Sequence, residues 1–159
     1  MRVDYRNVFP MAVKAMAGLE QVVNDSSLEP ELLELVRMRA SQINGCAYCL
    51  DMHSKDALAR GENQQRLLVL SAWRETAFYT DRERAALGWC ETLTSLPQTG
   101  APDDAYEPVA RSFDSEEIVA LTLAIIAING WNRFAVGLQS PVGDYVSPVA
   151  SAARRPATG

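Results

Sequence analysis

Apolar residues recur at the three- and four-residue spacing of an α-helix along almost the whole chain. The longest such stretch, residues 116–137, is apolar almost all round, so its helix is expected at the centre of the fold or at a subunit interface. No run shows the two-residue alternation of a half-buried β-strand, and no internal repeat is evident. The pattern therefore predicts an all-α fold, a single-domain helical bundle.

Helix-capping and helix-breaking residues mark the limits of the other predicted helices. Pro30 suits the first turn of a helix over 28–43, which Asn44 and Gly45 end. Thr80 and Glu83 form a capping-box pattern at the start of an amphipathic helix. The remaining helices are predicted over residues 3–23, with the helix proper starting near its proline, and over 46–60, 64–73 and 103–113.

A breaker-rich segment, residues 97–102, is predicted to be a loop within one domain, because too few residues follow it to form another. One domain is therefore predicted over residues 1–150. Residues 151–159 are predicted to be a disordered tail.

The composition limits the function classes. With 159 residues, of which 48% are hydrophobic, the chain can bury a proper core without staples. A net charge of −5 argues against general nucleic-acid binding and against docking on anionic membranes. The run 118–128 is too short to span a bilayer, and the first ten residues lack the apolar region of a secretory signal. A cytoplasmic location is expected, with cysteines as thiols rather than as a disulfide framework.

Residues 34–53 hold the side chains with the most distinctive chemistry. They include Cys46, Cys49, the only histidine, His53, and one helix earlier Glu34. On a helix, cysteines three residues apart and a histidine four residues further lie on one face. The helix N-terminus stabilises a thiolate in the first turn, and an imidazole one turn later can hold the proton that the thiol releases. The spacing predicts a reactive dithiol.

Two cysteines separated by two residues also occur in other kinds of site. Haem attachment requires a histidine directly after the second cysteine, where this chain has Leu50. A structural zinc site needs four ligands, and the chain offers the two cysteines, His53 and at most Glu34 or Cys90. A thioredoxin-type motif follows a strand, and none is predicted. Two buried structural cysteines beside a core histidine remain an alternative.

Three neighbouring side chains are interpreted from their positions. Glu34 taken by itself reads as a solvated surface residue paired with Arg37, beside the apolar stripe of its helix. Cys90 lies on the apolar face of its helix and is predicted to be a buried thiol that behaves as a small hydrophobe. Tyr48, between the two cysteines, is predicted to form part of the wall of the site.

The spacing Glu34-x11-Cys46-x2-Cys49-x3-His53 resembles the peroxidase signature of the alkylhydroperoxidase D and carboxymuconolactone decarboxylase superfamily. The core of the match is RASQINGCAYCLDMHSKDALARGE, and the similarity continues through residues 80–94 and 116–136. It covers most of the chain from about residue 31. The chain is similar to the small single-domain members, commonly described as peroxidase-related.

The resemblance implies an all-helical homo-oligomer, a trimer or a hexamer, and it implies roles. Cys49 would be the peroxidatic cysteine that attacks a hydroperoxide and becomes a sulfenic acid, and Cys46 would resolve it to a disulfide. His53 would help to deprotonate Cys49, and Glu34 would complete a proton relay through Cys46 or a bound water. No resident cofactor or metal is expected. Turnover would require an external dithiol reductant, a lipoylated or thioredoxin-like protein.

Tyr48 departs from the family pattern, because the founding peroxidases carry a second histidine just before the peroxidatic cysteine. A phenol can pass a proton but does not form a stable anion near neutral pH, so weaker activity or a relay through water is expected. The true decarboxylases lack the cysteine pair, which argues against lactone decarboxylation. The leading hypothesis is thiol-dependent hydroperoxide reduction. The alternatives are a non-catalytic redox sensor or interaction protein, and a helical enzyme with zinc on Cys46, Cys49 and His53.

Overall fold

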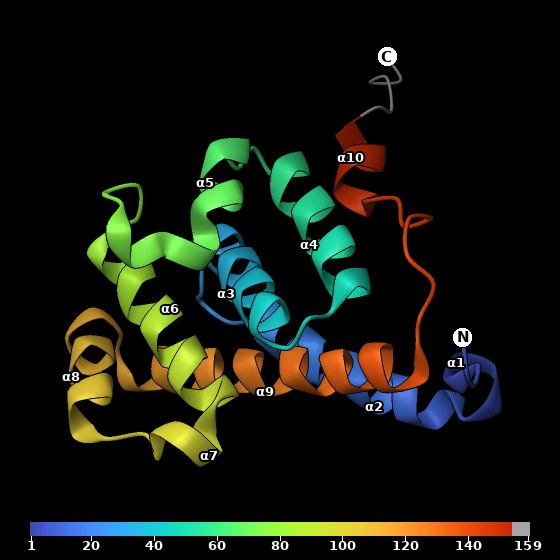
Figure 1. The fold of residues 1–159 in the computed structure, drawn as a ribbon, viewed down its shortest axis with the longest axis horizontal. Coiled ribbons are helices and arrows are strands. Elements are labelled where there is room, and N and C mark those ends of the chain that lie inside the picture. Colours follow the sequence, from blue (N-terminus) through green and yellow to red (C-terminus); the bar gives the residue numbers. More distant parts are fainter. Residues whose placement is uncertain (154–159) are drawn as a thin grey trace.

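The computed structural model describes residues 1–153. In this part of the chain every regular element is a helix, as Figure 1 shows, which confirms the predicted all-α class. The elements in chain order are α1 (Tyr5–Val8), α2 (Pro10–Asn24), α3 (Pro30–Ile43), α4 (Ala47–Ala59), α5 (Gln64–Val69), the 3-10 helix η1 (Leu70–Glu75), α6 (Asp81–Thr94), α7 (Leu96–Thr99), α8 (Asp103–Ser112), α9 (Ser115–Leu138) and α10 (Pro148–Ala153).

The longest helix, α9, runs along one side of the bundle (Figure 1). Asp114 caps it with a capping box, in which its side chain accepts a hydrogen bond from the backbone of Glu117. Its buried face packs against α2, α3, α4 and α6. Each fully buried leucine or isoleucine on that face, such as Leu121 and Ile128, stabilises the fold by about 1.5–3 kcal/mol.

The opposite face of α9 is open to solvent and apolar, with Val119, Ile126 and Val136 exposed. By length and composition alone α9 could cross a membrane, since its mean hydropathy is 1.5. Contacts with several neighbouring helices are also what the core helix of a bundle makes. The buried face of α9 agrees with the predicted central placement. The placement at a subunit interface stays a prediction for the exposed face.

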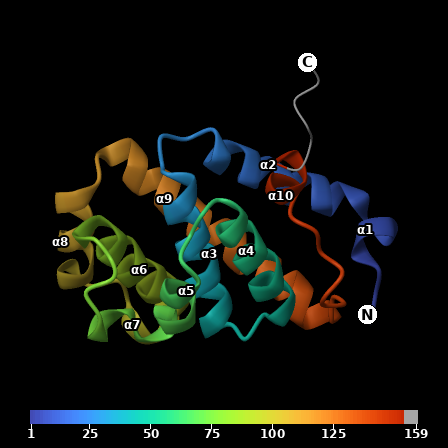
Figure 2. The same cartoon turned by 90° about the horizontal axis from the view of Figure 1, so that it is seen from above.

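The second central helix is α3, which lies between α4, α6 and α9 (Figure 2). Its sides contribute to two separate clusters of buried residues. Leu33 and Val36 belong to the cluster that includes α9, whereas Leu35 and Met38 belong to the cluster with α5 and η1. Helix α3 is enclosed on several sides. Helix α4 packs against it and also contributes buried side chains.

Several predicted boundaries agree with the structure, and two do not. Thr80 is the N-cap of α6 with the full capping box, and α2 begins at Pro10. The helix predicted over 64–73 instead ends at Val69 and continues as η1, where the non-helical angles of Ala72 interrupt it. The segment predicted as a loop over 97–102 contains the end of the four-residue α7, which Gly100 terminates in the left-handed conformation.

The N-terminal residues lie against the end of α9. The backbone and side chain of Arg2 donate to the carbonyls of Leu138 and Gly137, and Tyr5 contacts Ser140 at 3.3 Å. Helix α10 packs against α4. Residues 151–153 of the predicted disordered tail complete α10, and its remainder, 154–159, lies outside the described residues.

Candidate active site

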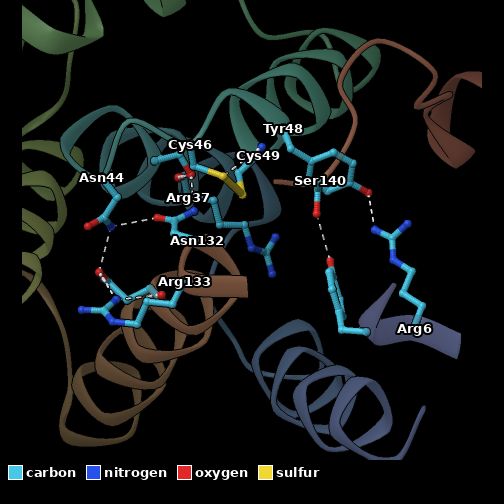
Figure 3. The surroundings of a disulfide bond; sticks show 12 residues. Arg6, Arg37, Asn44, Cys46, Tyr48, Cys49, Asn132, Arg133 and Ser140 are labelled. Atoms are coloured by element: carbon cyan, nitrogen blue, oxygen red, sulfur yellow. Dashed lines mark hydrogen bonds between the residues drawn. A yellow bond between two sulfur atoms is a disulfide. The ribbon is translucent and has the colours of Figure 1, made fainter. Parts of the chain in front are cut away.

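A tight turn between α3 and α4 sets the position of the two cysteines. Gly45 adopts φ +64°, a left-handed conformation that side chains with a Cβ rarely adopt, so the chain reverses directly after α3. Cys46 follows as the N-cap of α4, and its Sγ accepts a hydrogen bond from the backbone of Cys49 at 3.3 Å. The two form a disulfide with their Cα atoms 5.4 Å apart (Figure 3). The predicted placement of both cysteines in the first turn is therefore found in the structure.

Polar side chains of α9 hold this turn in place. The Asn44 amide donates to the side-chain oxygens of Asn129 and Asn132 at 2.9 and 2.8 Å (Figure 3). Asn132 donates in turn to the hydroxyl of Ser41, whose backbone carbonyl accepts from the N–H of Cys46. Sequence reasoning missed these contacts. The signal was a pair of asparagines in an otherwise apolar helix, because buried amides require partners.

A cavity of about 410 Å³ opens beside the disulfide. Cys49, Tyr48, His53 and Glu34 all line it, together with residues of α1, α2, α9 and α10, whereas Cys46 does not. Both cysteines are 1% exposed, so access to Cys49 runs through this cavity. A small molecule in the cavity would therefore meet Cys49 and not Cys46.

Glu34 is buried, at 3% exposure, and bonded on both carboxylate oxygens. One oxygen lies 2.8 Å from Nδ1 of His53, and the other accepts from Nη1 of Arg37 at 3.0 Å. Arg37 also donates to Glu20 and Asn24 of α2, which covers this side of α3. The pairing with Arg37 was predicted correctly. Reading Glu34 alone as a solvated residue was wrong, because α2 and α4 shield it.

The charge on Glu34 determines which nitrogen of His53 carries a proton. Burial raises the pKa of Glu34, but the hydrogen bonds with His53 and Arg37 and the positive charge of Arg37 outweigh it and hold the pKa below its ordinary value. An ionised carboxylate only accepts, so Nδ1 of His53 is the donor. Among the described residues no hydrogen bond engages Nε2 of His53, so this nitrogen can accept a proton. The Glu34 carboxylate thus reaches His53 directly rather than through Cys46.

Tyr48 forms part of the cavity wall, as predicted. Its hydroxyl accepts a hydrogen bond of 2.7 Å from Nη2 of Arg6, whose guanidinium lies 5.4 Å from the centre of the Tyr48 ring (Figure 3). The contact with Arg6 joins residues 42 positions apart in sequence, and no local pattern predicts it. It places α1 against the cavity.

The geometry also identifies residues that could hold a metal ion. In the described part of the chain Glu34, His53 and Asp56 each offer one ligand atom, and these atoms lie within 4.8 Å of one another. The cysteines are not in this group, and their sulfurs are bonded to each other. The structure therefore does not assemble the zinc site considered for Cys46, Cys49 and His53. Because both oxygens of Glu34 already have partners, proton transfer suits the group better than metal binding.

Cys90, the third cysteine, lies apart from the cavity in α6. It is fully buried, and its Sγ donates to the carbonyl of Val36 at 3.4 Å. Burial raises its pKa to about 12. The prediction of a buried thiol is confirmed.

Known proteins share both the fold and much of the sequence. Uncharacterized protein YdfG of Bacillus subtilis is 41% identical over 137 residues, which span 86% of this chain and 93% of YdfG. ATU0492 of Agrobacterium tumefaciens, a protein of unknown function proposed to be the antioxidant defence protein AhpD, is 46% identical. Its structure superposes with a TM-score of 0.87 over 91% of this chain and 99% of that one.

The debrominase Bmp8 shares the fold alone, at 22% identity and a TM-score of 0.75, over 90% of this chain and 75% of Bmp8. The carboxymuconolactone decarboxylase family is matched over residues 10–92, which contain the disulfide, His53 and Glu34. The chain therefore belongs to the carboxymuconolactone decarboxylase family, within the superfamily of alkylhydroperoxidase D-like proteins.

Proposed function

We propose that this protein is a thiol-dependent peroxidase that reduces hydroperoxides through a cycle between the Cys46–Cys49 dithiol and its disulfide. One observation carries the proposal. Cys49 lies in the first turn of α4 at the wall of a cavity, which it shares with His53, itself held by the buried Glu34. The likeness to ATU0492, at 46% identity, supports the same function class.

The first half of the cycle begins with the reduced dithiol. Nε2 of His53 takes the proton of Cys49, and the N-terminus of α4 stabilises the thiolate. The thiolate sulfur attacks the terminal oxygen of the hydroperoxide, and the O–O bond breaks. The alkoxide that leaves takes the proton back from His53 as the alcohol, while Cys49 becomes a sulfenic acid. Atoms and protons balance within this step.

The second half closes the disulfide. The Cys46 sulfur attacks the sulfur of the sulfenic acid, the S–O bond breaks, and the hydroxide leaves as water with the proton of Cys46. The Cα separation of 5.4 Å lies in the range of ordinary disulfides, so the backbone can remain in place. An external dithiol, from a lipoylated or thioredoxin-like protein, then reduces the disulfide by exchange.

A redox sensor is the second candidate. The observation in its favour is restricted access, because both cysteines are 1% exposed and Arg6 of α1 contacts Tyr48 at the cavity wall. If a partner reduced the Cys46–Cys49 disulfide only slowly, the oxidised form would persist and would serve as the signal. The two functions differ in turnover, since a sensor consumes about one peroxide per dithiol and an enzyme consumes many.

The test is the number of peroxide molecules consumed per protein when dihydrolipoamide or reduced thioredoxin is supplied in excess. We expect many turnovers for the wild type and none above background for Cys49→Ser. Consumption that stops near one peroxide per protein with every donor would favour the sensor. Stoichiometric zinc in protein purified without chelators would contradict the dithiol cycle.

The quaternary structure is proposed to be a homo-oligomer, a trimer or a hexamer. Its support is the apolar face of α9, where Val119 is 68% and Ile126 is 55% exposed. Exposed aliphatic residues aligned along one helix are typical of a surface that another subunit covers. Light scattering of the purified protein tests this, and a monomer at micromolar concentration would contradict it.

A further inference from the structure

One charged group of the cavity has no part in the cycle described so far. Asp56 lies three residues after His53 on α4 and lines the same cavity. One of its carboxylate oxygens is within 4.8 Å of a nitrogen of His53 and of an oxygen of Glu34. His53 therefore has a second carboxylate nearby, beyond the one that holds its Nδ1.

Tyr145 fixes the position of this carboxylate. Its hydroxyl donates to both oxygens of Asp56, at 2.8 and 3.0 Å. Burial and the hydrogen bond to Asp56 raise the pKa of Tyr145, so the phenol keeps its proton and is the donor. Lys55 holds the backbone of the segment that contains Tyr145, since its ammonium donates to the carbonyls of Gly143 and Tyr145. The segment before α10 is thereby fastened to α4.

Some of the charges around the cavity are matched, but that of Asp56 is not. Arg37 is paired with Glu34 and Glu20. In the described part of the chain no ion pair involves Asp56 or Arg60, which lies one turn further along α4. The charged and titratable groups that line the cavity with His53 are Tyr5 and Arg6 of α1, Glu20 of α2, Glu34 and Arg37 of α3, Tyr48, Cys49 and Asp56 of α4, and the C-cap residue Arg60. Tyr145 contacts Asp56.

We propose that Asp56, positioned by Tyr145, stabilises through the negative charge of its carboxylate the proton that His53 takes from Cys49. The ligand atoms of the two side chains lie within 4.8 Å of each other, close enough for an opposite charge to favour the protonated imidazole. The proton passes from Cys49 to Nε2 of His53, is retained there, and then goes to the leaving oxygen. Asp56 does not touch the peroxide, so it is a positioning residue. The inference rests on the proposed function for the peroxide step only.

The first test is the pH dependence of a single turnover of reduced protein with hydrogen peroxide, read as disulfide formed by mass spectrometry after rapid acid quench. Loss of the carboxylate in Asp56→Asn weakens retention of the proton at His53. The alkaline limb of the profile is then expected to move to lower pH by roughly one unit. Tyr145→Phe should shift it in the same direction by less.

Asp51→Asn is the matched control. Asp51 is also an aspartate of α4, but it pairs with Lys55 and does not line the cavity. We expect its profile to match the wild type. An unchanged profile in Asp56→Asn, or equal shifts in the Asp56 and Asp51 variants, would overturn the inference. If Asp56→Asn does not fold, Tyr145→Phe alone decides, because it keeps the carboxylate and removes one hydroxyl.

A second readout separates this inference from the proposed function, because it needs no peroxide. In a Cys46→Ser background, the rate of Cys49 alkylation by iodoacetamide reports the thiolate fraction. Asp56 is nearer in sequence to His53 than to Cys49, so its loss should act mainly on the imidazolium and lower the rate near neutral pH by a few-fold. If the wild type fails to reduce peroxide but the alkylation rate still falls, the proposed function fails and the inference stands. An unchanged alkylation rate contradicts the inference.

Discussion

Cys49 and Cys90 are the same residue type at nearly the same burial, yet their surroundings differ in almost every other respect. Cys49 is 1% exposed and Cys90 is fully buried. Cys49 lies in the first turn of α4, at a cavity wall shared with His53. Cys90 lies within α6, and its Sγ faces a backbone carbonyl of α3.

The difference indicates that a buried thiol stays protonated and inert unless neighbouring groups stabilise its thiolate. Around Cys90 the contact with Thr94 and the charge of Arg39 offset only part of the desolvation, and its pKa rises to about 12. Around Cys49 three features can offset it: the positive end of α4, an imidazole with a free nitrogen, and a carboxylate that orients that imidazole. We therefore propose that reactivity in this fold depends on the first turn of one helix and not on the number of cysteines.

The largest expected contrast is in alkylation of the reduced, folded protein. A thiol with a pKa of about 12 holds almost no thiolate at neutral pH, so Cys90 should react at least roughly a thousandfold more slowly than Cys49. Peptide mass spectrometry after timed exposure to iodoacetamide measures both sites in one sample. Addition of urea should make Cys90 reactive. Similar rates at the two sites in the folded protein would remove the basis of the comparison.

The next contrast concerns the groups that activate Cys49. His53→Asn removes the proton acceptor and should slow the reaction with peroxide by about a hundredfold, and Glu34→Gln by about tenfold. The control is Glu91→Gln, because Glu91 is likewise bonded by arginines, Arg39 and Arg74, but lies beside Cys90. Stopped-flow rates should leave the Glu91 variant near the wild type. A loss as large as that of Glu34→Gln would mean that the effect is structural.

Much of the fold and part of the site follow from local sequence. The capping box at Thr80 and the placement of both cysteines in one turn depend on residues a few positions apart. Such spacings determine hydrogen bonds directly, and they were read correctly.

The remainder depends on tertiary contacts that no local pattern contains. Glu34 is buried because α4 covers it with His53 and α2 supplies Glu20 and Asn24 to its partner Arg37. The bond between Arg6 and Tyr48 depends in the same way on where α1 lies. No local pattern predicted the non-helical angles of Ala72 within η1.

A smaller effect is expected on stability. Because the pKa of Glu34 lies below its ordinary 4.5, its ionised form stabilises the native state above about pH 4.5, and this contribution is lost as the pH falls through the lowered pKa. Glu34→Gln should therefore cost about 2 kcal/mol at neutral pH and less in acid. Urea unfolding at neutral pH and below pH 4 measures both values. An equal loss at the two pH values would contradict an ionised Glu34.

The smallest effect is expected for Tyr48. Its hydroxyl receives a hydrogen bond from Arg6 and gives none to Cys49 or His53. Tyr48→Phe should change the rate of peroxide reduction by less than about threefold, since the wall of the cavity keeps its ring. A tenfold loss measured in the same stopped-flow assay would instead place the phenol in the proton relay.

The most direct measurement of the central claim is sulfenic-acid trapping with a dimedone probe in Cys46→Ser exposed to hydrogen peroxide. The resolving thiol is absent there, while Cys49 and Cys90 both remain. We predict the adduct on Cys49 alone, and in the wild type the Cys46–Cys49 disulfide in its place. An adduct on Cys90 at a comparable rate, or on neither cysteine, would contradict the claim that the first turn of α4 activates Cys49.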